Sequence, residues 1–137
     1  MLDSLSGKFL IIDDDESLRN LLEVIISSAG AESLFAAKPS EAIDLLTSRT
    51  EEIEAILLDL NLEGSNGENL YDELVAIKPE LLIFPMSGCY DEEIKERLAG
   101  RRIDGLITKP FLSAGLIKIL SDGIAKRNNL DLSSQRI

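Results

Sequence analysis

Ile56-Leu57-Leu58-Asp59-Leu60-Asn61 is an apolar run that breaks off at a single carboxylate. The polar, Gly-containing segment Glu63-Gly64-Ser65-Asn66-Gly67 follows it, and this pattern predicts a buried strand with Asp59 at its end. Open α/β sheets bind ligands at the carboxyl ends of their strands. An Asp in this place also closes turns by bonding to its own backbone, so Asp59 alone does not distinguish a turn from a functional site.

Four further apolar runs alternate with helical patterns along the chain. Phe9 to Ile12 ends in Asp13-Asp14-Asp15, which repeats the strand-to-acid arrangement of the opening stretch. From Ser17 the apolar residues recur at helical spacing as far as Gly30, which ends the expected helix. The remaining strands are expected at residues 32–36, 81–84 and 103–107, and the remaining helices after Pro39, after Gly67, at residues 91–100 and from Ser113 through Ile124.

The alternation of five strands with five helices predicts an α/β fold. Consecutive parallel strands need helical crossovers, which are right-handed and cover both faces of the sheet. We therefore expect one doubly wound, five-stranded parallel sheet in a single domain over residues 1–127. Residues 128–137 lose the hydrophobic periodicity and are expected to form a loose tail or the start of a connection to a further segment.

The composition excludes several classes of chemistry. The chain has 137 residues, a formal net charge of −11, no histidine and one cysteine, Cys89. So acidic a chain does not neutralise nucleic-acid phosphates, and no direct nucleic-acid partner is expected. One cysteine without histidine can form neither an intramolecular disulfide, nor a Cys/His zinc site, nor a Ser-His-Asp triad. No apolar run is long enough to span a membrane and no signal pattern is visible, so we expect a cytoplasmic protein.

Polar residues follow four of the five expected strands. Asp13-Asp14, Asp59, Ser87 and Lys109 come after the first, third, fourth and fifth strands, and the carboxyl ends of parallel strands share one edge of a sheet. Carboxylates that converge there repel one another, by about 4 kcal/mol for two charges about 4 Å apart at an effective dielectric of about 20. A cation relieves this repulsion, and oxygen-only ligation suits Mg²⁺. The hydroxyl and the ammonium complete a set of groups that can bind a phosphoryl group.

These residues resemble the response-regulator receiver domain, the CheY-like family. The resemblance extends over residues 7–127 and rests on four motifs in order: Phe9-Leu10-Ile11-Ile12-Asp13-Asp14-Asp15, Leu57-Leu58-Asp59-Leu60-Asn61, Met86-Ser87-Gly88 and Thr108-Lys109-Pro110-Phe111. It implies a flavodoxin-like sheet with the strand order 2-1-3-4-5.

The resemblance also implies a phosphoryl switch. Asp59 would accept a phosphoryl group from a histidine of a sensor histidine kinase or a histidine phosphotransfer protein. Asp13, Asp14 and Asp59, with the backbone carbonyl of Asn61, would bind Mg²⁺. Apart from its own phosphorylation and dephosphorylation, such a protein would not be an enzyme, and we expect a monomer or a weak dimer.

Ser87, Leu106 and Lys109 would transmit the signal. In the family pattern the residue at Ser87 moves toward the new phosphoryl group, and the residue at Lys109 pairs with it. Receiver domains usually carry Tyr or Phe three residues before the lysine, whereas this chain has Leu106 there. We therefore expect a muted or differently transmitted signal at the protein-interaction surface, to which a downstream protein target would bind.

Three local features give expectations that a structure can test. Pro85 lacks the N–H that a residue of an internal strand donates, so we expect a bulge or an early strand end there. Leu112 stands where a helix N-cap is common, so the last helix is expected to begin with Ser113. The Lys109-Pro110 bond is a candidate for a cis peptide in a tight turn.

Two other functions remain open. Asp13 and Asp15 also match the Asp-x-Asp of haloacid-dehalogenase-type phosphatases, in which Asp13 would be the nucleophile and Asp15 the general acid. That family needs further acidic ligands beyond the lysine, and only Asp122 and Asp131 follow here. The second alternative is a receiver-shaped interaction module that no longer cycles phosphate. No output domain follows the expected receiver domain within this sequence, so the signal is expected to pass through a protein partner, through a phosphorelay, or to a part of a longer protein.

Overall fold

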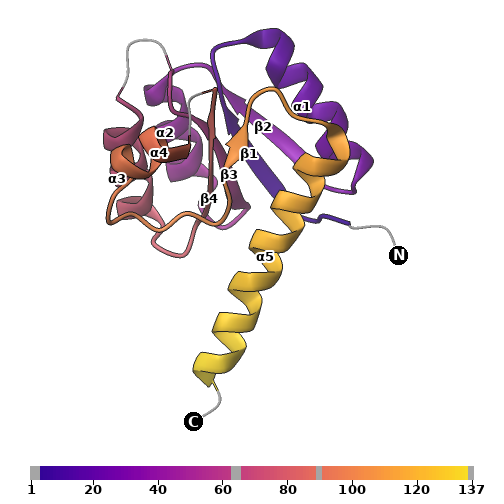
Figure 1. Ribbon diagram of the computed structural model, residues 1–137, viewed down its shortest axis with the longest axis vertical. Coiled ribbons are helices and arrows are strands. Elements are labelled where there is room, and N and C mark those ends of the chain that lie inside the picture. Colours follow the sequence, from indigo (N-terminus) through magenta and orange to yellow (C-terminus); the bar gives the residue numbers. More distant parts are fainter. Residues whose placement is uncertain (1–3, 63–65, 89–90, 136–137) are drawn as a thin grey trace.

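The fold is a parallel sheet with helices on both faces (Figure 1). The computed structural model describes residues 4–62, 66–88 and 91–135 of the chain. The elements in chain order are β1 (Lys8–Ile12), α1 (Glu16–Ser28), β2 (Glu32–Ala36), α2 (Pro39–Ser48), β3 (Ile53–Asp59), α3 (Gly67–Ile77), β4 (Leu82–Ser87), α4 (Asp91–Arg97), β5 (Ile107–Thr108) and α5 (Ser113–Gln135). The strand order is β2-β1-β3-β4-β5 and all neighbours are parallel, so the predicted doubly wound, flavodoxin-like α/β fold is confirmed.

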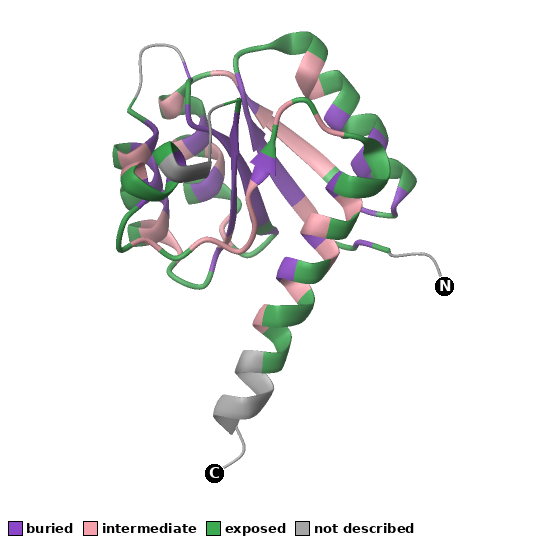
Figure 2. Cartoon of the chain, in the orientation of Figure 1, coloured by how far each residue is buried: buried purple, intermediate pink, exposed green. Residues whose placement is uncertain are grey.

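Two hydrophobic cores lie on opposite faces of the sheet. Successive side chains of a strand point to opposite faces, and β1 shows the result. Leu10 and Ile12 pack with residues of α2, α3 and α4, whereas Phe9 and Ile11 pack with residues of α1 and α5. Figure 2 shows the buried central strands, with the edge strand β2 mostly intermediate, among helices whose outer sides are exposed. A strand covered on both faces is apolar throughout, which explains the continuous apolar runs of the sequence.

Polar side chains and a proline determine where several helices begin. The Asp15 side chain is the N-cap of α1, and the Asn66 side chain accepts two amide hydrogen bonds at the start of α3. Pro39 occupies the first position of α2, where an N–H would have no partner within the helix. α5 begins at Ser113, as expected from the sequence.

Pro85 lies inside a regular strand, so the expected bulge or early strand end is wrong. β4 continues past this residue and pairs with β3 without a register shift. The backbone N–H and C=O of Ile83 face the β5 side, where they bond to Asp104, and Pro85, two residues further on, faces the same side. Because β5 begins only at Ile107, the missing N–H of Pro85 faces a segment that is not part of the ladder.

β5 is shorter than the strand predicted over residues 103–107. It contains only Ile107 and Thr108. Asp104 replaces part of the missing ladder, because its backbone N–H donates to the Ile83 carbonyl at 2.9 Å and its carboxylate accepts from the Ile83 N–H at 2.8 Å. Two arginine side chains bind the same carboxylate. A charged side chain therefore satisfies the edge of β4 where the sequence pattern indicated a strand.

α5 is longer than expected. The loose tail predicted from residue 128 is wrong as far as Gln135, because the helix continues to that residue. Arg127 ties the middle of the helix to the domain through an ion pair with Asp104 at 3.0 Å. Figure 1 shows the C-terminal part of α5 projecting beyond the sheet. Hydrophobic periodicity reports where a helix packs, and a helix can continue after its packing ends.

No helix in the described ranges combines the length and the apolar character that crossing a bilayer requires.

Candidate functional site

Three carboxylates meet where β1 and β3 end. The register that pairs Ile12 with Leu58 places Asp13 beside Asp59 at the carboxyl edge of the sheet. One oxygen from each of Asp13, Asp14 and Asp59 lies within 4.8 Å of the other two. Asp13 and Asp59 are only 1% and 4% exposed, whereas Asp14 is exposed. The structure thus brings the three predicted acids together, with two of them buried and one facing solvent.

Backbone amides orient the two buried carboxylates. Asp13 Oδ1 accepts from the Asp15 N–H at 2.9 Å, and Asp59 Oδ1 accepts from the Asn61 N–H at 2.9 Å. Burial raises the pKa of the Asp13 carboxyl above its ordinary value; the Asp15 amide opposes this rise, the charge of Asp59 adds to it, and Lys109 opposes it. The ionised form of Asp13 would therefore gain stabilisation from a further cation beside it.

Lys109 supplies positive charge to the site. Its Nζ lies 3.3 Å from Asp13 Oδ2 and 3.5 Å from Asp59 Oδ1. The Lys109 N–H donates to the Ser87 carbonyl at 2.8 Å, which joins the ends of β4 and β5, and Ser87 is buried there. The Lys109-Pro110 peptide bond is cis, as the sequence suggested. Ser87 and Lys109 therefore lie at the edge of the sheet that carries the carboxylates.

The donor atoms fit a hard divalent cation. The cluster offers oxygen atoms from three carboxylates, a ligand set that suits Mg²⁺ rather than zinc. Three negative charges at this edge face the ammonium of Lys109, so a bound cation would reduce the repulsion that remains. Mg²⁺ keeps several of its waters and needs few protein ligands, which matches two buried carboxylates beside one that faces solvent.

Asn61 and Leu106, also singled out by the sequence, lie in different surroundings. Asn61 follows the phosphoacceptor candidate Asp59 by two residues and bonds to it through its N–H. Leu106 lies just before β5, is half-buried and packs against the core on the α2, α3 and α4 side of the sheet. Any role of Leu106 therefore lies in transmission rather than in the chemistry at the carboxylates.

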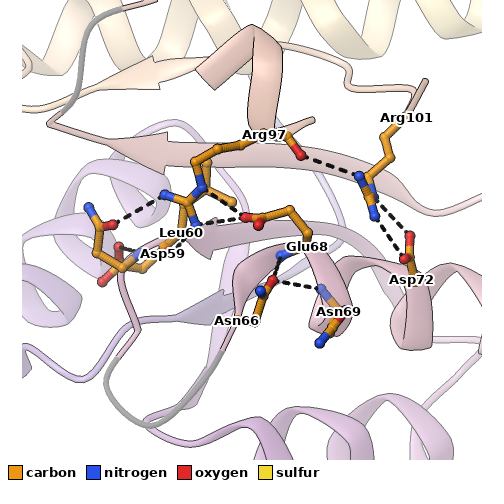
Figure 3. A network of polar contacts seen from close by, with 9 residues as sticks. Asp59, Leu60, Asn66, Glu68, Asn69, Asp72, Arg97 and Arg101 are labelled. Atoms are coloured by element: carbon orange, nitrogen blue, oxygen red, sulfur yellow. Dashed lines mark hydrogen bonds and ion pairs between the residues drawn. The ribbon is translucent and has the colours of Figure 1, made fainter. Parts of the chain in front are cut away.

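Arg97 is a residue of this region that the sequence patterns missed. It lies in the last turn of α4, and its guanidinium donates to the Leu60 carbonyl at 2.9 Å and to the Glu68 carboxylate at 2.6 Å (Figure 3). These partners are 37 and 29 residues away in the sequence, and contacts of that range leave no local pattern. The one available signal is the place of Arg97 between Ile94 and Leu98, the buried residues of this segment.

Comparison with known protein families gives a match over most of the chain. The family model of the response regulator receiver domain matches residues 9–121. The chain is a response regulator receiver domain. This family relationship favours the receiver over the phosphatase alternative. In that alternative Asp15 would be a general acid, whereas here its carboxylate caps α1 by accepting from the Leu18 N–H at 3.1 Å.

Curated relatives of this receiver domain are longer proteins. An NtrX-like response regulator of Rickettsia bellii is 28% identical over 134 residues, which cover 93% of this chain and 28% of that protein. The cell cycle response regulator CtrA of Brucella ovis is 31% identical over 110 residues, which cover 80% of this chain and 47% of that protein. The chain thus spans less than half the length of these relatives.

Solved structures share the fold. NtrX from Brucella abortus superimposes with a TM-score of 0.82 at 26% identity, over 95% of this chain and 30% of that one. A response regulator receiver domain protein from Clostridium thermocellum superimposes with a TM-score of 0.80 at 19% identity, over 90% of this chain and 98% of that one. The second likeness concerns the fold alone.

Proposed function

We propose that Asp59 is the phosphoacceptor of this receiver domain and that its phosphoryl group comes from a phosphohistidine of a sensor histidine kinase or a histidine phosphotransfer protein. The observation that carries the proposal is the position of the Asp59 carboxylate, which is buried, lies 3.5 Å from Lys109 Nζ and shares the end of the sheet with two other carboxylates. The 137 residues of the sequence contain no histidine, so the phosphohistidine lies outside this receiver domain.

The proposed transfer is a displacement at phosphorus. A carboxylate oxygen of Asp59 attacks the phosphorus and forms an O–P bond, while the P–N bond to histidine breaks and its electron pair stays on the imidazole nitrogen. Lys109 is close enough to Asp59 for its ammonium to offset charge on the phosphoryl oxygens. Mg²⁺, held by Asp13, Asp14, Asp59 and the backbone carbonyl of Asn61, would neutralise further charge.

Phosphorylation would change the charge at this edge of the sheet. A phosphoryl group carries about −1.5 to −2 charges at pH 7 and offers strong acceptor oxygens. We propose that the Ser87 hydroxyl and the Lys109 ammonium move toward the phosphoryl group. This movement would shift the conformational equilibrium of the loops after β4 and β5. Leu106 has no aromatic ring whose rotamer could follow this movement, so the signal is muted or takes another route.

The readout is proposed to be protein binding. The phosphorylated domain would bind a downstream protein target in the cytoplasm, as a monomer or a weak dimer, without direct contact to nucleic acid. Attack of water on the acyl phosphate restores the Asp59 carboxylate and releases inorganic phosphate, and we propose no catalysis on other substrates. The net charge of −11 supports a protein target rather than nucleic acid.

Phosphorylation with acetyl phosphate tests the proposal. We expect Mg²⁺-dependent modification of the wild-type protein at Asp59, located by peptide mass spectrometry, and none in Asp59→Asn. Asp44→Asn removes the same charge from an exposed position of α2 and should be modified like the wild type. Modification of Asp13 with Asp59 untouched would support the phosphatase alternative, and no modification of the wild type would support the non-cycling module.

A further inference from the structure

Arg97 links α4 to the loop that follows the proposed phosphoacceptor. Its Nη2 donates to the Leu60 carbonyl at 2.9 Å, and its Nη1 donates to the side-chain oxygen of Asn61 at 3.3 Å. Nε and Nη2 also donate to Glu68 Oε1, at 2.9 and 2.6 Å. Figure 3 shows the guanidinium between this loop and the first turn of α3, with Asp59 beside the loop. One side chain of α4 therefore holds both residues that follow Asp59.

A single peptide group connects Arg97 to Asp59. The Leu60 carbonyl and the Asn61 N–H belong to the same planar peptide unit. Its carbonyl end accepts from Arg97 at 2.9 Å, and its amide end donates to Asp59 Oδ1 at 2.9 Å. A charged donor on the carbonyl polarises the unit and strengthens the hydrogen bond at its amide end. Rotation of this peptide plane therefore changes both hydrogen bonds together.

We propose that Arg97 is a positioning residue that couples the position of α4 to the phosphorylation state of Asp59, an inference that rests on the proposed function. When Asp59 becomes an acyl phosphate, both of its carboxyl oxygens lose the charge of the carboxylate, and the hydrogen bond from the Asn61 N–H weakens. The peptide unit is then held less firmly at its amide end and can rotate. Because Arg97 is hydrogen-bonded to the carbonyl of this unit, the rotation changes the position of α4. This coupling does not depend on an aromatic side chain at position 106, where the chain has Leu106.

A second arginine provides a contrast to Arg97. Arg101 binds Asp72 of α3 through hydrogen bonds of 2.9 and 3.0 Å (Figure 3). Both arginine side chains are 25% exposed, but the side chain of Asp72 is 55% exposed and that of Glu68 only 19%. In the described ranges, neither Arg101 nor Asp72 hydrogen-bonds to the loop after β3. Arg101 Nη1 also donates to the backbone carbonyl of Arg97 at 3.3 Å. Arg101→Ala therefore removes an arginine pair with α3 and one bond to the last turn of α4, but it leaves the Arg97 guanidinium and the peptide link to Asp59 intact, and it serves as the control.

Amide hydrogen exchange with beryllofluoride as the phosphoryl mimic tests the coupling. In wild-type protein and in Arg101→Ala, we expect Mg²⁺ and beryllofluoride to change the protection of the amides of residues 94–99 by about fivefold or more. In Arg97→Ala this change should fall below about twofold. Coupling is reciprocal, and Arg97 strengthens a hydrogen bond that the adduct weakens. In Arg97→Ala the beryllofluoride concentration for half-saturation should therefore fall by about fivefold.

The outcomes separate the coupling from the phosphoacceptor function. Arg97→Lys keeps the charge without the planar fork, so it should give an intermediate response, and it serves as the test if Arg97→Ala does not fold. A wild-type response of α4 in the Arg97 variants overturns the coupling, although adduct formation at Asp59 would still support the proposed function. Absence of an adduct in the wild type overturns the proposed function and the coupling with it.

Discussion

Replacement of Asp13 by asparagine should stabilise the protein when no divalent cation is present. An oxygen of Asp13 lies within 4.8 Å of oxygens of Asp14 and Asp59, which corresponds to a repulsion of about 3.5 kcal/mol or more for each pair at an effective dielectric of about 20. The Lys109 ammonium at 3.3 Å offsets about 5 kcal/mol of this repulsion. Solvent at Asp14 screens part of the remainder, so we expect Asp13→Asn to raise the free energy of unfolding by about 1–2 kcal/mol in EDTA.

Mg²⁺ should reverse this order of stability. A cation that binds only the folded state stabilises it by about 2.7 kcal/mol when its free concentration is about 100 times its Kd. Asp13→Asn lacks one proposed carboxylate ligand and should gain much less. Urea unfolding followed by circular dichroism, in EDTA and in Mg²⁺, measures both effects, and the exposed Asp44→Asn controls for net charge. A lower stability of Asp13→Asn than of wild type in EDTA would refute the reasoning, because attraction to Lys109 would then outweigh repulsion and burial.

The same variant gives a test by pH. The pKa of the Asp13 carboxyl is raised in the folded protein, mainly by burial, so the folded protein takes up this proton at a higher pH than the unfolded chain does. Between the two pKa values the folded state binds more protons, and this group's contribution to stability improves as the pH falls. The advantage of Asp13→Asn in EDTA should be full near neutral pH and shrink as the pH is lowered through the folded-state pKa of Asp13.

Two further predictions concern stability elsewhere in the domain, and urea unfolding measures both. Gly123→Ala should lower the free energy of unfolding by about 1–3 kcal/mol, because the new Cβ would lie 2.4 Å from the Asp104 carbonyl oxygen and 2.6 Å from the Phe84 ring. Gly115→Ala, in the same helix with no neighbour within 4 Å, should raise the free energy of unfolding by about 0.5–1 kcal/mol. Equal changes in stability for the two variants would contradict the clash at Gly123. Asp104→Ala should lower the free energy of unfolding by about 2–4 kcal/mol, because it leaves a β4 amide and two arginines without their carboxylate. Asp122→Ala removes only an exposed ion pair and should lower it by less than about 1 kcal/mol. Similar losses of stability in the two variants would argue against a structural role of Asp104.

Most of the fold could be predicted because its signals are local. Strands such as Phe9 to Ile12 are covered on both faces and form apolar runs, and helices such as α1 show apolar residues at helical spacing. Each of these elements can therefore be predicted from a short stretch of sequence. The parallel alternation then places the residues after the strands at one edge. The strand ends alone therefore predict that Asp13 and Asp59 lie together, as they do.

The errors arose where a local rule did not hold in the tertiary structure. The apolar residues Ile103, Leu106 and Ile107 predicted a strand over residues 103–107, but Asp104 binds the edge of β4 and leaves β5 with two residues. Pro85 contradicts the rule for internal strands, yet its missing N–H faces a segment outside the ladder. Residues after Arg127 lose their apolar stripe, and α5 nevertheless continues to Gln135.

The amino-acid sequence by itself determined the order of the elements, the parallel sheet and the edge at which the acids, Ser87 and Lys109 gather, because periodicity and strand ends are properties of neighbouring residues. Only the tertiary structure decided which groups touch there. The peptide between Leu60 and Asn61 bonds to Asp59 at one end and to Arg97 at the other, and Arg97 comes from a helix 37 residues away from Leu60. Such a contact depends on how α4 is placed relative to α3 and the loop after β3, and no local pattern encodes it.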